Sequence, residues 1–571
     1  MEEKLVNVIV NKISVSVPVG STILEAAKKV GINIPTLCYI KHINEIGACR
    51  VCVVEVEGMK NLVASCSTPV TEGMKITTAN ERIYSARKTN IELLLSSHNI
   101  DCLSCPRSLS CELQKLSREY CCDSKTFAGE KPEPHLDTSS LCLERDSSKC
   151  INCQKCIAVC SKVQTVNALT SNERGFNTVV GCAFGQELVN STCVECGQCT
   201  VVCPTGALYE KQDQRKVLKA LSNPNLTTIV AAAPSVRVAL GEEFGLPVGT
   251  NVEKKMITSL KRLGFSKVFD INFGADLTIV EEAQEFVTRL KENKLPMYTS
   301  CCPGWINFVK NFYPELKPLI SSCKSPQQMF GAVCKTYYAE KMGLDPKNIF
   351  VVTIMPCTAK KSELARPHQN AAGVNDVDAS LTTREFAVLL KQQGLFLPEL
   401  EDGNFDMPFG MYSGAGVIFG NTGGVMEAAL RTIVEKSTNK TLENPEFLLV
   451  RGEEGIKESE YEVNGEKIKV AVVSGLGNAR KLIESIKKGE KQFHFIEVMA
   501  CPGGCVCGGG MPRNPEVEHL GQKRAKGLYE SDKSNLQRSS HKNPAIINFY
   551  KEYLGEPNGE KAHKILHTKL D

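Results

Sequence analysis

Alternating apolar and polar positions at the start of the chain predict two short strands. Apolar residues recur at nearly every second position in 5–10 and again in 13–19, with Asn11-Lys12 between the two runs. This pattern is typical of strands joined by a tight turn. Thr22 followed by Glu25 fits a capping box, so we expect a helix from about Thr22 to Gly31.

Longer patterns follow. Residues 81–125 have helical periodicity, and residues 126–149 predict a linker because they include Pro132 and Pro134 in a polar stretch. From about residue 210, apolar runs of strand length alternate with helical patterns, which favours an α/β domain with parallel sheet character. The predicted buried strands are 228–234, 268–271, 349–354 and 468–474.

Composition narrows the class of protein. The 571 residues allow several domains, and a net charge of +4 gives no case for nucleic acid binding. No apolar run reaches the ~18 residues of a membrane span, and the amino terminus does not resemble a signal peptide. The 27 cysteines are therefore expected in a reducing cytoplasm, as metal ligands and not as disulfides.

A repeated cysteine run is the strongest local signal. The first run has C-x2-C-x2-C-x3-C spacing, and the second repeats it and ends in Cys-Pro. This is the pattern of bacterial two-cluster ferredoxins, in which the fourth cysteine of each run ligates the other 4Fe–4S cluster. One cluster then takes Cys150, Cys153, Cys156 and Cys203, and the other takes Cys193, Cys196, Cys199 and Cys160.

Two further ligand sets precede this repeat. The spacing C-x10-C-x2-C-x13-C resembles plant-type ferredoxins, which hold a 2Fe–2S cluster, although the first gap is longer than in the plant pattern. Its members are Cys38, Cys49, Cys52 and Cys66. The second set combines one histidine with three cysteines, which suits zinc as well as iron–sulfur. Its members are His98, Cys102, Cys105 and Cys111.

In the second half of the chain, three segments place cysteine beside Pro or Gly: 299–305, 355–360 and 497–505. Pro and Gly interrupt regular structure and let the backbone approach a bound group closely. Four of their thiols match the four-thiolate requirement of a cubane cluster: Cys302, Cys357, Cys501 and Cys505. Cys301 is left over beside a ligand and is a candidate for proton handling.

These three segments resemble the TSCCP-x-W, MPC-x-x-K and E-x-M-x-C-x-G-G-C motifs of the di-iron (FeFe) hydrogenases, in the same order. The resemblance covers essentially the whole chain and is close to the clostridial, multi-cluster form. It implies an α/β two-lobed catalytic domain in 210–571, with a fused small-subunit-like tail. It also implies a β-grasp 2Fe–2S ferredoxin domain in 1–80, a small helical 4Fe–4S domain with one His and three Cys ligands in 81–125, and the two-cluster ferredoxin domain in 126–209.

The family resemblance further implies an H-cluster, in which Cys505 joins the cubane to a di-iron unit with CO, cyanide and a bridging dithiolate amine. Lys360 and Ser235 match family residues that donate to the cyanides. Other positions match the lining of the pocket: Pro234, Gln327, Met355, Met499 and Phe419.

The implied reaction is the reversible reduction of protons to H2. Its proton route matches Cys301, Glu282, Ser321 and Glu285, with Arg289 one turn beyond. Electrons are expected from ferredoxin or flavodoxin through the accessory clusters, and the di-iron unit from dedicated maturation proteins. A cytoplasmic monomer is the expected form.

Some features remain open. Met511 and Cys507 depart from the family pattern near the cluster. Packing roles are predicted for Cys121, Cys122, Cys142, Cys182, Cys323 and Cys334. His563 and His567 are spaced like a zinc pair, but no third ligand is near in sequence, which favours packing or surface roles. Rival interpretations are an electron-transfer subunit of a complex I-like assembly, a cluster-assembly relative without the di-iron unit, and a hydrogen sensor.

Overall fold

The computed structural model describes residues 4–463 and 465–570, so the first three residues of the predicted amino-terminal segment lie outside it. The chain forms two compact units. Unit 1 comprises Met1–Val163, Asn167–Ser191 and Val202–Tyr209, and unit 2 comprises Gln164–Val166, Thr192–Val201 and Glu210–Asp571. The region of the repeated cysteine run is therefore divided between the two units.

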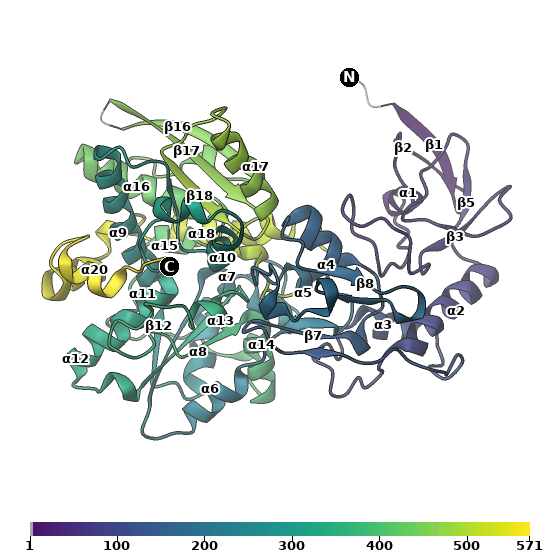
Figure 1. The fold of residues 1–571 in the computed structure, drawn as a ribbon, viewed down its shortest axis with the longest axis horizontal. Coiled ribbons are helices and arrows are strands. Elements are labelled where there is room, and N and C mark those ends of the chain that lie inside the picture. The colour runs from purple at the N-terminus through teal and green to yellow at the C-terminus, as the bar shows by residue number, and fades with distance from the viewer. Residues whose placement is uncertain (1–3, 464, 571) are drawn as a thin grey trace. The chain divides into compact units, whose positions relative to one another are not determined.

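Unit 1 begins with the predicted hairpin and helix. Strands β1 (Leu5–Val10) and β2 (Ile13–Pro18) pair antiparallel, and α1 (Ile23–Lys29) starts with the Thr22–Glu25 capping box. A five-stranded sheet of order β2-β1-β5-β3-β4 forms with β3 (Val53–Val56), β4 (Val63–Ala64) and β5 (Lys75–Thr77). The alternate apolar residues of β1 and β2 pack with α1 into one core (Figure 1). Both local predictions are thus confirmed.

The next part of unit 1 is helical only in part. Helices α2 (Glu81–Ser97) and α3 (Glu112–Glu119) flank a stretch of turns, 98–111, that carries the predicted histidine and cysteine ligands. The predicted linker 126–149 is wrong in its second half. Residues 130–135 are irregular, but β6 (Leu136–Asp137) and β7 (Leu143–Asp146) follow and pair antiparallel. Short elements complete this region: α4 (Lys155–Ala158), β8 (Thr170–Asn172) and β9 (Val179–Gly181).

Unit 2 contains the predicted parallel sheet. Its strand order is β12-β11-β14-β15, and every neighbouring pair is parallel. The strands are β11 (Thr227–Ala232), β12 (Lys267–Asp270), β14 (Ile349–Met355) and β15 (Ala379–Thr382). β14 is almost completely buried, as expected for a strand covered on both faces.

A second four-stranded sheet in unit 2 has the order β13-β18-β17-β16. Its strands are β13 (Met297–Tyr298), β16 (Ile456–Val463), β17 (Glu466–Ser474) and β18 (Phe495–Met499). β13, β18 and β17 run parallel, whereas β16 and β17 form an antiparallel hairpin. The two sheets give unit 2 two α/β layers, with helices packed on them (Figure 1).

Helix α9 (Ile271–Lys291) is the longest helix of unit 2 among the described residues. Asp270 caps it by accepting a hydrogen bond from Asn272 N, and fifteen of its residues are buried. A helix buried on most faces needs neighbours on several sides; α9 contacts α11 (Pro326–Val333), α15 (Gly414–Ile418) and α16 (Gly424–Thr438). Its buried carboxylates therefore need either partners or protons.

Further helices of unit 2 pack on the two sheets or on other helices. They are α6 (Gln214–Leu221), α7 (Pro234–Arg237), α8 (Glu253–Arg262), α10 (Pro303–Phe312), α12 (Ala339–Met342), α13 (Lys360–Glu363), α14 (Thr383–Gln392), α17 (Leu476–Lys487), α18 (Leu520–Ser534), α19 (Pro544–Phe549) and α20 (Glu560–Leu566). Within the part of the chain that the structure describes, none of the helices has the length and hydrophobicity needed to cross a bilayer.

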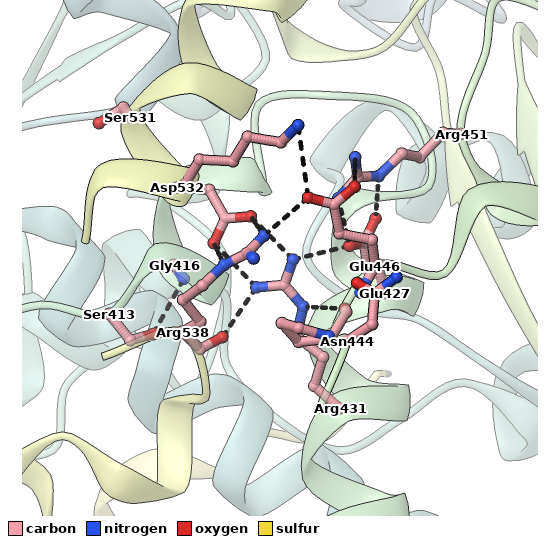
Figure 2. Close-up of polar contacts among 12 residues, drawn as sticks. Ser413, Gly416, Glu427, Arg431, Asn444, Glu446, Arg451, Ser531, Asp532 and Arg538 are labelled. Carbon is pink, nitrogen blue, oxygen red and sulfur yellow. Dashed lines mark hydrogen bonds and ion pairs between the residues drawn. The ribbon is translucent and has the colours of Figure 1, made fainter. Parts of the chain in front are cut away.

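A buried ion network fixes α18 to α16. Arg431 lies between two carboxylates, with Nη2 2.8 Å from Asp532 Oδ2 and 2.7 Å from Glu427 Oε1. Arg451 also binds Glu427 Oε1, and Arg538 also binds Asp532 Oδ2, so each of these oxygens contacts two arginines (Figure 2). Gly414 is needed beside the network, because a Cβ there would lie 2.1 Å from Asp532 Oδ1. The carboxy-terminal helices are thus tied to the core by charges withdrawn from water.

Candidate functional site: a four-cysteine centre with a buried acidic route

The predicted cluster segments of unit 2 all follow the carboxyl ends of strands. Cys301 and Cys302 come after β13, Cys357 after β14, and Cys501 and Cys505 after β18. Ligand sites of open α/β sheets form at this end of parallel strands. Since β14 belongs to one sheet and β13 and β18 to the other, the site is assembled from both layers.

Contacts between these segments bring the four thiols together. Ala500 N donates to Cys302 Sγ at 3.4 Å, and Gly510 N donates to Pro356 O at 2.8 Å, which joins the loop after Cys505 to the one before Cys357. The loop takes its path through glycines. Gly504 has φ +91°, and a Cβ there would lie 2.5 Å from Thr422 N. The loop can therefore place Cys505 at the site only because Gly504, the residue before it, has no side chain.

The donor set fits a cubane iron–sulfur cluster. Cys501 is 7% exposed, and Cys302, Cys357 and Cys505 are half-buried. Burial raises the pKa of the Cys501 thiol well above its usual value, and the charges of Cys357, Cys302 and Cys505 raise it further. If all four buried cysteines lost their protons, the four thiolates would repel one another. Bound iron would remove this electrostatic cost by balancing their negative charge.

Part of the repeated cysteine run lies against this centre within unit 2. Thr358 Oγ1 donates to Glu195 O at 2.7 Å, and Gln198 Nε2 donates to Cys507 O at 3.1 Å. Gly197 approaches so closely that a Cβ would lie 2.3 Å from Thr358 Oγ1. The loop carrying Cys193, Cys196 and Cys199 is therefore hydrogen-bonded to the segments that follow Cys357 and Cys505.

The predicted donor residues line the same region. Lys360 is buried, and its Nζ lies 2.7 Å from Glu363 Oε2 and 3.1 Å from the carbonyl oxygen of Cys301. An ammonium has three donors, so one remains for a further acceptor. Ser235 follows Pro234 at the first turn of α7, and its buried Oγ has no partner among the described residues. Both groups fit donors to a bound anionic ligand.

Gln327 differs from the prediction in one respect. Its Nε2 donates to Lys360 O and Glu363 Oε2, and its Oε1 accepts from Thr353 Oγ1. Its amide is thus already engaged within the protein, where it orients Lys360 and Glu363. The apolar residues predicted to line the pocket are buried: Met355, Met499 and Phe419.

The predicted proton route starts at the half-buried Cys301. Burial raises the pKa of its thiol well above the usual value, and the charge of Glu282 raises it further. Glu282 lies on α9, is fully buried and has no hydrogen-bond partner for either oxygen among the described residues. Burial, with a contribution from Glu285, raises the pKa of Glu282 to about 8.

The outer part of this route is hydrogen-bonded. Ser321 Oγ donates to Glu285 Oε2 at 2.8 Å, and Arg289 Nη2 lies 2.7 Å from Glu285 Oε1. Ser321 N donates to Tyr298 O at 2.8 Å, which fixes Ser321 beside the end of β13. The four predicted residues therefore come from three separate segments that the fold brings together.

Two buried amides near this region were missed by sequence reasoning. Asn421 and Gln328 are each at most 2% exposed, and neither side chain has a hydrogen-bond partner among the described residues. Asn421 lies beside Gly504, next to Cys505. No local pattern marks these residues, because an amide in a loop or helix is ordinarily solvated.

In unit 1, the proposed ligands share one core. The 2Fe–2S candidates Cys38 and Cys49, the histidine-set candidate Cys111 and the ferredoxin-type candidate Cys153 belong to, or pack against, a single apolar cluster. Asn44 Nδ2 donates both to Cys38 O at 2.7 Å and to Cys153 O at 2.9 Å. Candidate centres of different cysteine motifs thus lie side by side within this unit.

The individual sites of unit 1 fit metal clusters. Cys38, Cys49, Cys52 and Cys66 are all buried. His98 is buried with an unpartnered Nδ1, and burial, with Lys131 and Lys149, lowers its pKa to about 4, which keeps the imidazole neutral as a ligand must be. A Cβ on Gly206 would lie 2.5 Å from Cys105 Sγ, so this glycine makes room for the histidine set.

One ferredoxin-type set encloses a cavity. Cys150, Cys153, Cys156 and Cys203 line it together, as the repeat predicts. For the other set, Cys160 belongs to unit 1, and Cys193, Cys196 and Cys199 belong to unit 2. The 27 cysteines all lie among the described residues, and none of them forms a disulfide bond. Cys142, Cys182, Cys323 and Cys334 are buried as predicted for packing roles, whereas Cys121 is exposed.

The site therefore defines an iron–sulfur protein of the redox class. Family comparisons agree with it. The family described as iron only hydrogenase large subunit, C-terminal domain, matches residues 226–509, and the iron hydrogenase small subunit family matches 518–569. Three further families match the first part of the chain: a 2Fe-2S iron-sulfur cluster binding domain at 3–81, an NADH-ubiquinone oxidoreductase-G iron-sulfur binding region at 87–125 and a 4Fe-4S dicluster domain at 149–207.

Relatives match over almost the full length. Iron hydrogenase 1 of Clostridium pasteurianum is 44% identical over 569 residues, covering 98% of this chain and 99% of that protein. The NADP-reducing hydrogenase subunit HndD of Solidesulfovibrio fructosivorans is 47% identical, covering 97% and 96%. A solved apo [FeFe]-hydrogenase HydA1 from Chlamydomonas reinhardtii has a TM-score of 0.57 and 43% identity, covering 63% of this chain and 98% of that one.

The chain belongs to the iron-only, or FeFe, hydrogenase family, and is an oxidoreductase with ferredoxin-like 2Fe–2S and 4Fe–4S domains and a hydrogenase catalytic domain. The resemblance inferred from its three cysteine segments is thereby confirmed.

Proposed function

We propose that the protein catalyses the reversible reduction of protons to H2 at an H-cluster held by Cys302, Cys357, Cys501 and Cys505. One observation supports this most directly: the buried thiol of Cys301 is near enough to both Glu282 and the cluster cysteines Cys302 and Cys505 for their charges to raise its pKa beyond the effect of burial. An electron-transfer module needs the four thiolates but not a buried acid behind a spare thiol. Family membership makes hydrogen the expected substrate.

When bound, the cubane and its di-iron unit would supply an open iron position where two electrons and two protons combine to H2. The chain supplies the rest. Lys360 keeps one N–H donor, and Ser235 its hydroxyl, for the cyanide ligands. Met355, Met499 and Phe419 exclude water around them. Cys301 would donate the proton and recover it from Glu282, and Ser321 and Glu285 would connect Glu282 to the surface beside Arg289.

Electrons would enter through the accessory clusters. We assign a 2Fe–2S domain to 1–80, a one-His three-Cys 4Fe–4S domain to 81–125, a two-cluster ferredoxin domain to 126–209 and the catalytic domain to 210–571. The shared core of Cys38, Cys111 and Cys153 supports a relay in unit 1. The hydrogen bond from Thr358 to Glu195 supports delivery to the catalytic centre in unit 2. Ferredoxin or flavodoxin is the proposed donor to a cytoplasmic monomer, with the di-iron unit installed by maturation proteins.

A second electron partner is favoured by one comparison. The Solidesulfovibrio relative is named as a subunit of an NADP-reducing hydrogenase. Under this alternative the chain keeps its hydrogen chemistry but exchanges electrons with further subunits and not with free ferredoxin. Purification under native conditions distinguishes the two: a monomer that evolves H2 with reduced ferredoxin supports the first, and co-purifying subunits with NADPH-linked activity support the second.

Infrared spectroscopy tests the proposed chemistry directly. After maturation with the dedicated accessory proteins, we expect absorption bands of iron-bound CO and cyanide together with H2 evolution from a reduced viologen dye. The same protein made without maturation should contain iron–sulfur clusters but neither bands nor activity. A matured protein that shows only conventional iron–sulfur signals would rule out the proposed reaction.

The pH dependence of turnover tests Glu282. Burial raises the pKa of Glu282 to about 8, so the carboxyl holds its proton at neutral pH and loses it as pH rises through that value. A carboxylate has no proton to give to Cys301, so H2 evolution at constant driving force should fall above about pH 8. We expect Glu282→Gln to lower turnover by at least about 100-fold. Residual activity that still falls near pH 8 in this variant would show that another group controls the profile.

A further inference from the structure

A cluster of three potential metal ligands lies at the outer end of the proposed proton route. The ligand atoms of Glu285, Cys323 and His567 are within 4.8 Å of one another, and all three residues are buried. No third ligand lies near His567 in the sequence, because Glu285 and Cys323 are far from it in the chain. Only the packing of α9, the segment just before α11 and the carboxy-terminal tail brings the three together.

The backbone fixes this arrangement. Cys323 and His567 face each other in an isolated antiparallel bridge. On either side of it, Lys324 N donates to Leu566 O and Thr568 N donates to Ser322 O, both at 2.8 Å. Glu285 is held from the other direction, because Ser322 N donates to its carboxylate at 3.1 Å. The three side chains are therefore presented by hydrogen-bonded main chain and do not depend on a mobile loop.

The distances suit a small cation. Cys323 Sγ lies 3.6 Å from Glu285 Oε2. Ligand atoms of a tetrahedral zinc site are separated by about 3.2–3.8 Å, given zinc–ligand bonds of about 2.0–2.3 Å. Small side-chain shifts would bring the imidazole nitrogen into the same range. A mixed thiolate, imidazole and carboxylate set is the donor combination that zinc accepts and that hard cations do not.

Both ring nitrogens of His567 have oxygen partners, so a metal would replace one of these contacts. Its Nδ1 lies 2.8 Å from Ser322 Oγ, and its Nε2 lies 3.0 Å from Glu281 Oε2. Whichever ring nitrogen bound the metal, the other would keep an oxygen partner, which is the usual second contact of a ligating histidine. Glu281 is itself fixed by Asn558 N at 2.8 Å and by the hydroxyl of Tyr550.

We propose that Glu285, Cys323 and His567 form a binding site for a zinc(II)-class cation, with a water molecule as fourth ligand. Binding would replace the proton of the Cys323 thiol by the metal and release that proton to solvent. Burial and the nearby carboxylates raise the pKa of Cys323, so the free thiol is protonated and zinc must compete with its proton. Affinity is therefore expected to be lower than in a site with a preformed thiolate.

Occupancy has a functional consequence that rests on the proposed function. Glu285 accepts from Ser321 Oγ at 2.8 Å in the proposed proton route. A carboxylate that binds zinc no longer exchanges protons freely, so zinc should inhibit H2 turnover without touching the cluster. Removing the metal with a chelator should restore activity.

The test uses the complete holoprotein, freed of adventitious zinc and titrated with Zn²⁺ under anaerobic conditions. We expect one retained equivalent whose X-ray absorption shows one sulfur at about 2.3 Å and lighter N/O ligands at about 2.0–2.2 Å. Cys323→Ser and His567→Gln should each weaken binding at least about tenfold. His563→Gln is the matched control. Its ring centroid is 4.1 Å from that of His567, but it is exposed and outside the cluster, so binding should not change.

The outcomes separate the two proposals. Zinc surrounded by several sulfurs, or an affinity unchanged in both the Cys323 and His567 variants, would overturn the metal site. Zinc bound as expected but without effect on turnover would keep the site and count against Glu285 as a proton relay. A protein without H2 activity would refute the proposed function while the zinc affinities of the variants still decide the metal site.

Discussion

Cys301→Ala should abolish H2 evolution while leaving the iron content near that of the unsubstituted protein. Cys301 contributes no ligand to the proposed cubane, and its thiol is the only proposed connection between the centre and Glu282. Removing a positioned proton donor typically costs about 100- to 10,000-fold in rate. Activity with a reduced viologen dye, iron content and infrared spectra measured on the same preparation would check this prediction.

Cys334→Ala is a suitable control for the loss of a buried thiol. Cys334 is fully buried in the apolar core of unit 2 and is not part of the proposed site. We expect this variant to keep turnover within a few-fold of the original protein. The role of Cys301 would be refuted by unchanged H2 evolution in Cys301→Ala. Loss of the infrared bands in that variant would instead show that the thiol is needed for assembly.

Arg431→Met should strongly destabilise unit 2. The Arg431 side chain is fully buried, and its guanidinium binds Asp532, Glu427 and the carbonyl oxygens of Pro445 and Arg538. Among the described residues, removing it leaves Glu427 paired with Arg451 and Asp532 paired with Arg538 (Figure 2). Breaking a buried ion pair from one side costs about 3–5 kcal/mol. Thermal unfolding followed by circular dichroism should show a large drop in the transition temperature of this unit.

The matched control is Lys526→Met on α18. Lys526 Nζ lies 3.8 Å from Glu530 Oε1, and both side chains are more than half exposed. Exposed pairs of this kind contribute about 0–1 kcal/mol, so the transition should barely move. Equal effects of the two substitutions would show that burial of the Arg431 network does not stabilise the attachment of α18.

Prediction from the sequence succeeded where the determining interactions are local. The Thr22–Glu25 capping box, the hairpin of β1 and β2 and the parallel strand β14 each follow from residues a few positions apart. It failed within 126–149, where Pro132 and Pro134 suggested a linker but β6 and β7 follow them. Strands as short as β6, with two residues, and β7, with four, depend on a partner strand more than on their own pattern, so their sequence carries little signal.

The same distinction between local and long-range interactions applies to the candidate site. Cysteine spacing predicted the proposed metal ligands, because cluster geometry imposes fixed intervals on a loop, and the neighbouring Pro and Gly residues permit that loop. Gln327 was placed in the pocket by resemblance, but only the structure shows its amide engaged with Lys360, Glu363 and Thr353.

The amino-acid sequence by itself determined the cluster motifs, the α/β character of the second half and the membership of the FeFe hydrogenases. Those are properties of short segments and their order. Only the tertiary structure decided that Glu282 is buried without a partner and that His567 meets Cys323 and Glu285. Burial and contacts between distant segments depend on how helices and sheets pack, and no local pattern encodes that packing.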